Sequence, residues 1–385
     1  MRFADNRNKI GKYIPAVVFL IFIYGMALWF IFSPKPDYSS SEKRYLQKFP
    51  EVTAEKLLSG DFGSEFETFF ADRFPQRNTW VGLNAYTALA EGNNGASGVY
   101  NCKNGYLINK PVSTENNLDK NIGAVADFAK SIDTPTTVML VPSTGYIVDD
   151  VLPTFHDKYN DDEDISKISS TLSKDKIGFV DLRERFKSEY KNGSQLYYKT
   201  DHHWTTKGAY TGYQELCKAL GITPIDDSTL KKDSYPDFYG TTYSSSGFWL
   251  TPPDNIEIWN NPKNSDRNIS VKITEGANIK TSGSMYFPDH LKEDDKYPVF
   301  IDGNHALTEI TNTNAKNGTI FLIKDSFSHS LAPFLAENYS KVVLVDLRYY
   351  KESVSDLVTT YNPEQVVVLY GIDNLATDTD IVWLK

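Results

Sequence analysis

Cysteine is scarce in this sequence, and basic residues do not outnumber acidic ones. Cys102 and Cys217 are the two cysteines among 385 residues, which is too few for a disulfide-rich scaffold and leaves open whether these two pair. The chain carries 50 Asp and Glu against 40 Lys and Arg, a net charge of −10. A protein that binds nucleic acid usually presents a clustered basic surface. The charge balance therefore disfavours nucleic acid as a partner.

Motifs for cofactors and metals are also missing. The sequence has no glycine-rich phosphate loop and no dinucleotide-binding fingerprint. The adjacent His202 and His203 lack further ligands at suitable nearby spacing, so we expect no metal site and no cofactor. A metalloenzyme is the alternative, which loss of activity with a chelator would favour.

One long hydrophobic run lies near the N-terminus. Residues 13–32 are almost uninterrupted apolar, about the 20 residues that a helix needs to cross a bilayer. The run is longer than a usual signal-peptide core and lacks a small-x-small cleavage site, which favours an uncleaved anchor over a removed signal. A buried core helix is disfavoured because the run has no polar face.

The charges around this run predict its orientation. The basic residues before it are Arg2, Arg7, Lys9 and Lys12. Lys35 is the single cation close behind it. By the positive-inside rule, we expect residues 1–12 in the cytoplasm and the chain beyond the span outside the cell membrane.

Residues 33–97 are predicted to form a linker and a juxtamembrane helical region. The segment opens with a polar, proline-containing stretch, and helical periodicity follows from Phe62 to Tyr86. The phenylalanines that recur there at three- and four-residue spacings are Phe66, Phe69, Phe70 and Phe74. We interpret them as a packing stripe, and we expect Asp72 and Arg77 to pair.

Residues 98–385 alternate between short apolar runs and helical stretches, after a hairpin signal around an Asn-Gly pair at 98–108. The strands expected are 137–142, 177–182, 299–304, a run beginning at 319, 341–346 and 365–370, and the helices expected include 117–131, 164–174, 208–220 and 330–339. This alternation is typical of an α/β domain built on a mainly parallel sheet. Residues 228–297 break it with glycine, serine, proline and short β-prone pieces, which predicts a β- and loop-rich insertion that shapes substrate access.

The run Asp201-His202-His203-Trp204 carries the clearest chemical signal. An aspartate two residues before a histidine can hydrogen-bond one ring nitrogen and leave the other to take a proton from a nucleophile. The alternative is structural: Thr200 or Asp201 caps the helix that follows, and the imidazoles have no catalytic part.

This run, with Tyr-Lys-Thr before it and Thr-Thr-Lys-Gly-Ala-Tyr after it, resembles the signature of the DHHW protein family. Members of that family resemble the SGNH-hydrolase-like domains of polysaccharide O-acetyltransferases, such as those acting on alginate. The resemblance covers about residues 60–385 and implies an α/β/α sandwich. The family's catalytic histidine directly precedes tryptophan, which implies His203, while His202 and Trp204 become candidates for substrate binding.

Ser326 fits the later serine that the resemblance requires. It follows a buried strand where the chain turns toward a helix, and functional groups gather at the carboxyl ends of strands in doubly wound sheets. Asp325-Ser326 resembles the Gly-Asp-Ser block of SGNH hydrolases, with Lys324 in place of glycine. The implied roles are nucleophile for Ser326, general base for His203 and orienting group for Asp201. Alternatively, Asp325 or Ser326 merely caps the next helix.

Other candidates carry less specific signals. Gly303-Asn304 resembles a pair that completes the oxyanion hole with a backbone donor and a side-chain amide, and an ordinary turn is the alternative. Arg348 is a candidate for binding an anionic substrate or, alternatively, for pairing with Asp346. His329 lies one turn beyond the serine, and we expect it at a solvated helix position.

These residues and the resemblance together imply a membrane-anchored O-acyltransferase that faces outward and acetylates hydroxyls of a cell-wall or secreted polysaccharide. Because acetyl-CoA is cytoplasmic, the resemblance also implies a multispanning membrane acyltransferase as the acyl donor partner. One alternative is a carbohydrate acetyl esterase, in which water is the acceptor. The other is a non-catalytic, glycan-binding wall protein. A separation of more than about 6 Å between Ser326 and His203 would favour the latter, since a triad requires hydrogen-bond reach, about 2.6–3.2 Å.

Overall fold

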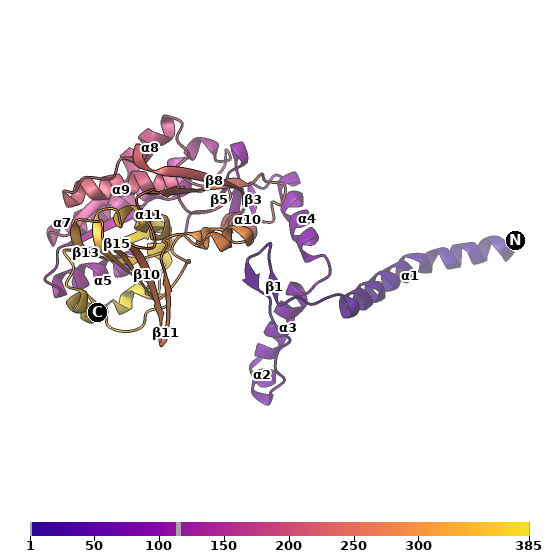
Figure 1. The fold of residues 1–385 in the computed structure, drawn as a ribbon. Coiled ribbons are helices and arrows are strands. Elements are labelled where there is room, and N and C mark those ends of the chain that lie inside the picture. Colours follow the sequence, from indigo (N-terminus) through magenta and orange to yellow (C-terminus); the bar gives the residue numbers. More distant parts are fainter. Residues whose placement is uncertain (1, 113–116, 385) are drawn as a thin grey trace. The chain divides into compact units, whose positions relative to one another are not determined.

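The structure is a computed structural model that describes residues 2–112 and 117–384, with side chains from Lys12 onward. Met1 and Lys385, the outer ends of the ranges predicted from the sequence, lie outside the described residues. Figure 1 traces the elements along the chain.

The chain divides into two compact units, Met1–Tyr86 and Thr87–Lys385. The first unit begins with the long helix α1 (Arg2–Phe32). Among the described residues, its segment Lys12–Phe32 is the one helix long and apolar enough to cross a membrane, and its most apolar stretch is not buried. By length and composition this helix fits a single-pass anchor or a signal sequence.

The rest of the first unit is a set of short elements. They are β1 (Tyr38–Ser39), β2 (Arg44–Tyr45), α2 (Ala54–Ser59), α3 (Asp61–Asp72) and α4 (Arg77–Ala90), which runs into the second unit. The helical periodicity breaks between α3 and α4, because Pro75 disfavours helix at the residue before it and Gln76 has a φ of 56°. Asp72 lies 3.8 Å from the Nε of Arg77, as expected, and pairs more closely with Arg44 at 2.5 Å.

The second unit is built on one mixed sheet. Within the described residues its strands, in spatial order, are β11 (Asn278–Ser282), β10 (Ile269–Glu275), β12 (Leu307–Asn312), β14 (Tyr339–Val345), β13 (Asn317–Lys324), β15 (Gln365–Gly371), β6 (Thr136–Val141) and β7 (Gly178–Asp181). The five strands from β14 to β7 are parallel to one another. Beyond β14 the sheet continues with β12, β10 and β11, and each of these strands is antiparallel to the one before it. The mainly parallel sheet predicted from the sequence is confirmed.

Helices cover both faces of this sheet. Met139 and Val141 of β6 belong to one hydrophobic cluster, and Val138 and Leu140 belong to a second, because successive side chains of a strand point to opposite faces. The helices that contribute residues to the first cluster are α8 (Arg183–Lys191), α9 (Thr206–Leu220) and α11 (Ser328–Leu335). Those that contribute to the second are α5 (Leu118–Ser131), α7 (Asp161–Lys174), α12 (Val354–Tyr361) and α13 (Ile372–Thr377). Figure 1 shows α9 and α5 on opposite sides of the strands. The predicted α/β/α sandwich is therefore confirmed.

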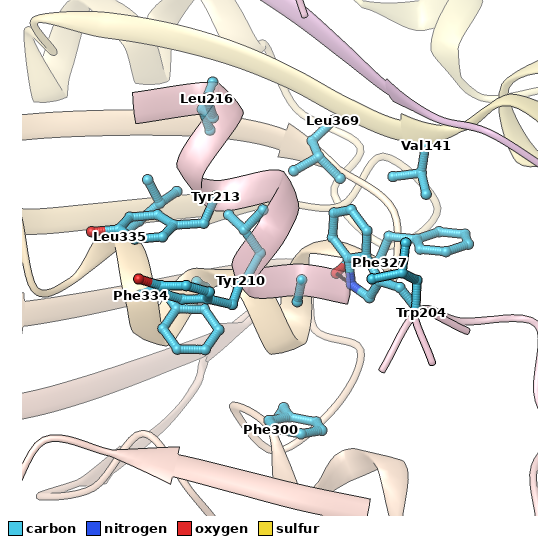
Figure 2. Packing of buried hydrophobic residues seen from close by; sticks show 14 of the residues in the cluster. Val141, Trp204, Tyr210, Tyr213, Leu216, Phe300, Phe327, Phe334, Leu335 and Leu369 are labelled. Atoms are coloured by element: carbon cyan, nitrogen blue, oxygen red, sulfur yellow. Dashed lines mark hydrogen bonds between the residues drawn. The ribbon is translucent and has the colours of Figure 1, made fainter. Parts of the chain in front are cut away.

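Aromatic side chains fill the layer between α9 and α11. Figure 2 shows Tyr210, Tyr213 and Leu216 of α9 beside Phe334 and Leu335 of α11. The ring centroids of Tyr210 and Tyr213 lie 5.3 and 5.6 Å from that of Phe334. This packing fixes α11 on the sheet and so fixes the turn that precedes it.

Smaller elements surround the sandwich. They are β3 (Gly95–Ala96), β4 (Val99–Asn101), β5 (Leu107–Asn109), α6 (Thr144–Ile147), β8 (Lys231–Phe238), α10 (Thr241–Ser246), β9 (Asp254–Asn260) and the 3₁₀ turns η1 (Lys103–Gly105), η2 (Asp149–Val151), η3 (Asp227–Thr229), η4 (Pro288–Lys292), η5 (Tyr297–Val299) and η6 (Ile381–Trp383). The β- and loop-rich range 228–297 holds the antiparallel pairs β8–β9 and β10–β11, and β10 joins it to the main sheet.

The strand predicted at 299–304 is wrong. Val299 ends the 3₁₀ turn η5, and Ile301, Asp302 and Gly303 have φ angles of 48°, 66° and 87°. A strand requires negative φ, and a β-branched isoleucine rarely adopts the left-handed region. An apolar run therefore forms a strained turn here.

The two cysteines, whose pairing the sequence left open, are free thiols. Burial raises the pKa of Cys102 and of Cys217 to about 12. Both stay protonated at neutral pH and are poor nucleophiles.

Candidate active site

The histidine run lies in a tight loop before α9. Tyr197 and Trp204 pair across this loop as an isolated β-bridge. The side chain of Thr205 caps α9, so the alternative role of Thr200 or Asp201 as the helix cap does not apply. The loop therefore leaves the carboxylate of Asp201 available for other partners.

Ser326 lies in the turn between β13 and α11, at the carboxyl ends of the parallel strands. The carboxylate of Asp325 accepts hydrogen bonds from the N–H groups of Phe327 and Gly371, at 2.9 and 2.7 Å. The amide of Asn374 donates to the same carboxylate at 2.7 Å. Burial raises the pKa of Asp325, while these three donors oppose the rise. Asp325 thus ties the serine turn to the end of β15 and does not cap α11.

The structure brings Asp201, His203 and Ser326 into one series of hydrogen bonds. Nε2 of His203 lies 2.7 Å from Oγ of Ser326, and Nδ1 lies 2.5 Å from Oδ1 of Asp201. Asp201 and His203 are almost fully buried, while Ser326 keeps 8% of its surface exposed. This arrangement allows His203 to take a proton from the Ser326 hydroxyl.

Thr241, at the start of α10, holds Asp201 from the other side. Its N–H and its hydroxyl donate to Oδ2 of Asp201 at 2.7 and 3.1 Å. Although burial alone would raise it, the neighbouring His203 and His202 and these hydrogen bonds hold the pKa of Asp201 well below its usual range. Asp201 is therefore ionised at neutral pH. Thr241 lies 40 residues downstream of Asp201, and its spacing gave no sign of this contact.

Tyr297 is a further site residue that the sequence did not single out. Its ring lies parallel to the imidazole of His203, with 4.0 Å between centroids and 9° between planes. Its hydroxyl donates to the C=O of Ser326 at 3.2 Å. Tyr297 is the first residue of η5 and belongs to no motif, so its position follows from the fold alone.

His202 and Trp204 have different environments. Nδ1 of His202 lies 2.7 Å from Oγ1 of Thr241, and its side chain is 29% exposed. Burial, followed by the neighbouring His203, lowers the pKa of His202 to about 4, so this imidazole is neutral at neutral pH.

Trp204 is fully buried, and its indole N–H donates to the C=O of Phe327 at 3.0 Å. Trp204 therefore joins the histidine loop to the serine turn, and its buried indole has no exposed surface for the substrate contact expected of it.

A cavity lies beside Asp201 and the residue that follows Ser326. Its lining includes Asp201, His202, Phe327, Ser143, Asp373 and Asn374. The hydroxyl of Ser143 donates to Asp373 at 3.0 Å, and its N–H donates to Asp161 at 2.7 Å. Burial raises the pKa of Asp373 to about 6. Burial and then the charge of Asp373 raise the pKa of Asp161 to about 7. Of these two acidic residues, Asp373 lines the cavity, and its carboxyl group can accept hydrogen bonds from hydroxyl groups.

Gly303 and Asn304, the pair expected to complete the oxyanion hole, have different contacts. The N–H of Gly303 donates to the C=O of Phe300 at 3.1 Å, so it is not available as the expected oxyanion donor. Asn304 is exposed, and its Oδ1 accepts from Arg348 at 2.9 Å, a contact that does not use the side-chain N–H₂ group expected to donate to an oxyanion. Arg348 also forms an ion pair with Asp346 at 2.6 Å. This ion pair is the alternative role that the sequence offered for Arg348. The Arg348 side chain remains 39% exposed, so its binding of an anionic substrate stays a prediction.

A backbone donor closer to the nucleophile is that of Ser326 itself. Within the part of the chain that the structure describes, no acceptor contacts the N–H of Ser326. The start of a buried helix follows it, and the N-terminal end of a helix favours developing negative charge. We therefore take the Ser326 N–H, in place of Gly303, as the candidate oxyanion donor.

Lys324, at the glycine position of the serine block, is buried behind the turn with 2% of its surface exposed. Its ammonium donates to Asp346 at 2.9 Å and to Nε2 of His329 at 2.8 Å. Burial and then the charge of Lys324 hold the pKa of His329 well below its usual range, so this imidazole is neutral. The solvated position expected for His329 is wrong, because every residue of α11 is buried.

Asp201, His202 and His203 also place ligand atoms within 4.8 Å of one another, a spacing that suits a metal ion. Nδ1 of His203 and the Asp201 carboxylate are bonded to each other, however, and Nε2 of His203 contacts Ser326. These atoms are therefore occupied by the triad contacts.

Two solved structures are similar to this chain over most of its length. A DHHW family protein from Eubacterium siraeum is 17% identical, with a TM-score of 0.63, and the match covers 75% of this chain and 95% of that one. Bacillus cereus PatB1 with a sulfonyl adduct is 21% identical, with a TM-score of 0.62, and the match covers 74% of this chain and 97% of that one. Both likenesses show a shared SGNH-hydrolase-like fold.

The sequence comparisons agree with the motif. A search of functionally curated proteins found no significant match. The family described as DHHW protein matches residues 87–345, a range that contains Asp201, His203 and Ser326. This chain belongs to the DHHW protein family.

Proposed function

We propose that this chain is a membrane-anchored O-acyltransferase that faces outward and transfers acetyl groups to hydroxyls of a cell-wall or secreted polysaccharide. The observation that carries the proposal is the hydrogen-bonded series of Asp201, His203 and Ser326 beside a cavity. The 2.7 Å between His203 and Ser326 lies within the reach that a triad needs, about 2.6–3.2 Å. It speaks against the non-catalytic alternative.

In the first step, Oγ of Ser326 attacks the acyl carbonyl carbon while Nε2 of His203 takes the hydroxyl proton. The ionised Asp201 stabilises the resulting imidazolium through its hydrogen bond to Nδ1. The N–H of Ser326 stabilises the negative charge that develops on the carbonyl oxygen. His203 then gives its proton to the departing donor, and the acetyl group stays on Ser326.

In the second step, a hydroxyl of the polysaccharide attacks the acetyl carbonyl and gives its proton to His203. The tetrahedral intermediate collapses, and His203 returns the proton to Oγ of Ser326. Ser143 and Asp373, which both line the cavity, accept hydrogen bonds from neighbouring hydroxyls of the acceptor. Those contacts favour a sugar hydroxyl over water as the second nucleophile.

The proposed topology places residues 1–12 in the cytoplasm, residues 13–32 in the membrane and the catalytic residues 98–385 outside. A domain outside the membrane cannot reach cytoplasmic acetyl-CoA, so the acetyl group must be delivered across the bilayer. The family resemblance supports a multispanning acyltransferase as the partner that delivers it.

The test uses the full-length protein in detergent with a chromogenic acetyl ester. We expect wild type and the matched control Ser245→Ala, at an exposed serine of α10, to release the chromophore, and Ser326→Ala to be inactive. Since PatB1 has been solved with a sulfonyl adduct and sulfonyl fluorides modify activated serines, we also expect a sulfonyl fluoride to label wild type and not Ser326→Ala.

A soluble polysaccharide acceptor added to the same reaction separates the transferase from the esterase. Acetyl groups on the polysaccharide, formed only by proteins with Ser326, would support the transferase, and release of acetate alone would favour the esterase. Wild type and Ser326→Ala that are folded yet equally inert to the ester and to the sulfonyl fluoride would contradict the proposal.

A further inference from the structure

Six phenylalanine rings in the first unit form a continuous cluster that includes the end of α1. The members of this phenylalanine cluster are Phe30, Phe49, Phe62, Phe66, Phe69 and Phe70. The ring centroid of Phe30 lies 4.7 Å from that of Phe70 and 6.2 Å from that of Phe69. Phe49 lies 5.4 Å from Phe69. Ring contacts therefore run without a break from α1 to α3.

The cluster has a large exposed surface. Phe49, Phe66 and Phe70 are 58%, 40% and 43% exposed. Leu58, in the neighbouring helix α2, is 90% exposed. Large apolar side chains gathered in this way mark a surface that binds a partner or a membrane.

α3 carries these rings on one face. Its phenylalanines recur at three- and four-residue steps, which places them on one side of a helix with 3.6 residues per turn. Ser64 lies on the opposite side and is exposed. The acidic residues of the helix are Asp61, Glu65, Glu67 and Asp72. α3 is thus amphipathic, and phenylalanine on the apolar face is typical of helices that lie in a membrane interface.

We propose that the phenylalanine cluster lies in the headgroup region of the bilayer that α1 crosses, with α3 resting on the membrane surface. This inference rests on the proposed anchor. Phe30 is close to the end of α1 at Phe32, so the end of the span puts its ring near the boundary between hydrocarbon and headgroups. Rings in contact with Phe30 lie at a similar depth.

Continuity with α1 favours lipid over a protein partner as the occupant of this surface. Because α1 tethers the cluster at the bilayer, apolar contact with lipid needs no separate association from solution. The charges of α3 are acidic, so its attraction to the membrane is apolar and does not depend on anionic lipid. The consequence is that the segment leading to the catalytic unit stays at the membrane surface, close to an acyl donor in the membrane.

The test is spin-label accessibility in the full chain, reconstituted in phosphatidylcholine vesicles, with both native cysteines replaced by serine. Single cysteines are introduced by Phe66→Cys and Phe49→Cys in the phenylalanine cluster and by Ser64→Cys on the opposite face of α3. Val18→Cys reports on the span itself. Collision with oxygen reports lipid, and collision with a water-soluble nickel complex reports water.

We expect the labels at 66 and 49 to collide several-fold more with oxygen than with nickel, and the label at 64 to do the reverse. Water accessibility at 66 and 49 with a lipid-exposed label at 18 would overturn this inference and leave the anchor intact. Water accessibility at 18 would overturn the anchor.

Labels at 66 and 49 that neither reagent reaches would show that a protein or a second copy covers the surface, which also contradicts the inference. Phe49→Cys keeps the test decisive if Phe66→Cys fails to fold, because Phe49 lies outside α3 and is 58% exposed.

Discussion

The ring of Tyr297 lies parallel to the imidazole of His203 at a centroid distance of 4.0 Å, and its hydroxyl donates to the C=O of Ser326. One side chain therefore contacts both the proposed general base and the backbone of the proposed nucleophile. We infer that Tyr297 positions these two groups and takes no part in proton transfer.

Replacing Tyr297 separates its two contacts. Tyr297→Phe keeps the stacked ring and loses the hydroxyl, so we expect it to keep most of the esterase rate. Tyr297→Leu loses the parallel ring, and we expect kcat to fall about tenfold to hundredfold because the imidazole is less well positioned. Steady-state kinetics with a chromogenic acetyl ester measures both variants. Equal losses, or a fall in thermal stability that explains the loss in Tyr297→Leu, would contradict the positioning role.

The adjacent histidines provide a second prediction. His203→Ala removes the group bonded to Ser326, and we expect a loss in kcat of about 10²- to 10⁴-fold. His202→Ala removes a neutral imidazole bonded to Thr241, and we expect most of the activity to remain. Labelling by a sulfonyl fluoride, followed as intact mass, should show the same order. If His202→Ala were the more damaging change, the assignment of the base would be reversed.

The fold and part of the site could be predicted because their signals are local. Short apolar runs identify the parallel strands of the sheet, and two brief motifs point to Asp201, His203 and Ser326, of which His203 and Ser326 are 123 residues apart. Tyr297 has no such signal, because it belongs to no motif and nothing in the sequence distinguishes it from the other tyrosines of the chain. The apolar residues at 299–304 predict a strand, because they do not reveal the positive φ angles of Ile301, Asp302 and Gly303.

Burial explains a further error. His329 follows Ser326 in a helix, and from the sequence we expect its side chain at a solvated position. α11 packs inside the sandwich, however, and all its residues are buried. The buried Lys324 that accompanies it was visible in the sequence only as a departure from glycine. Its ion pair with Asp346 depends on two strand ends that become neighbours only in the folded sheet.

Asp161 predicts how stability depends on pH. Its pKa of about 7 in the folded protein exceeds the value of about 3.9 in an unfolded chain. The folded state therefore binds more protons at Asp161 in this interval, and the contribution of Asp161 to the free energy of unfolding falls as pH rises from about 4 to about 7. Asn cannot ionise, so Asp161→Asn should gain stability relative to wild type across that interval and hold the gain above it.

Urea unfolding of the wild type and of Asp161→Asn, compared at about pH 4 and about pH 8, measures this difference. A difference in unfolding free energy that is the same at both pH values would show that Asp161 does not titrate as described.

Lys324 provides a prediction about stability near the serine turn. Lys324→Met removes one partner of a buried ion pair and leaves Asp346 with Arg348 as its remaining cation. We expect a loss of about 3 kcal/mol in the free energy of unfolding. The matched control is Lys341→Met on β14, whose contact with Glu309 is 3.8 Å long and partly exposed, with an expected loss of about 0–1 kcal/mol. Equal losses in denaturant unfolding would contradict the structural role of Lys324.

The most direct test of the central claim is to trap the acyl-enzyme. Full-length wild type, Ser326→Ala and His203→Ala are mixed with the acetyl ester, quenched in acid and digested, and the peptides are read by mass spectrometry. The account predicts an acetyl group on Ser326 in wild type, little or none in His203→Ala and none on this peptide in Ser326→Ala. An acetyl group on another residue at the wild-type level in Ser326→Ala, with ester turnover unchanged, would contradict it.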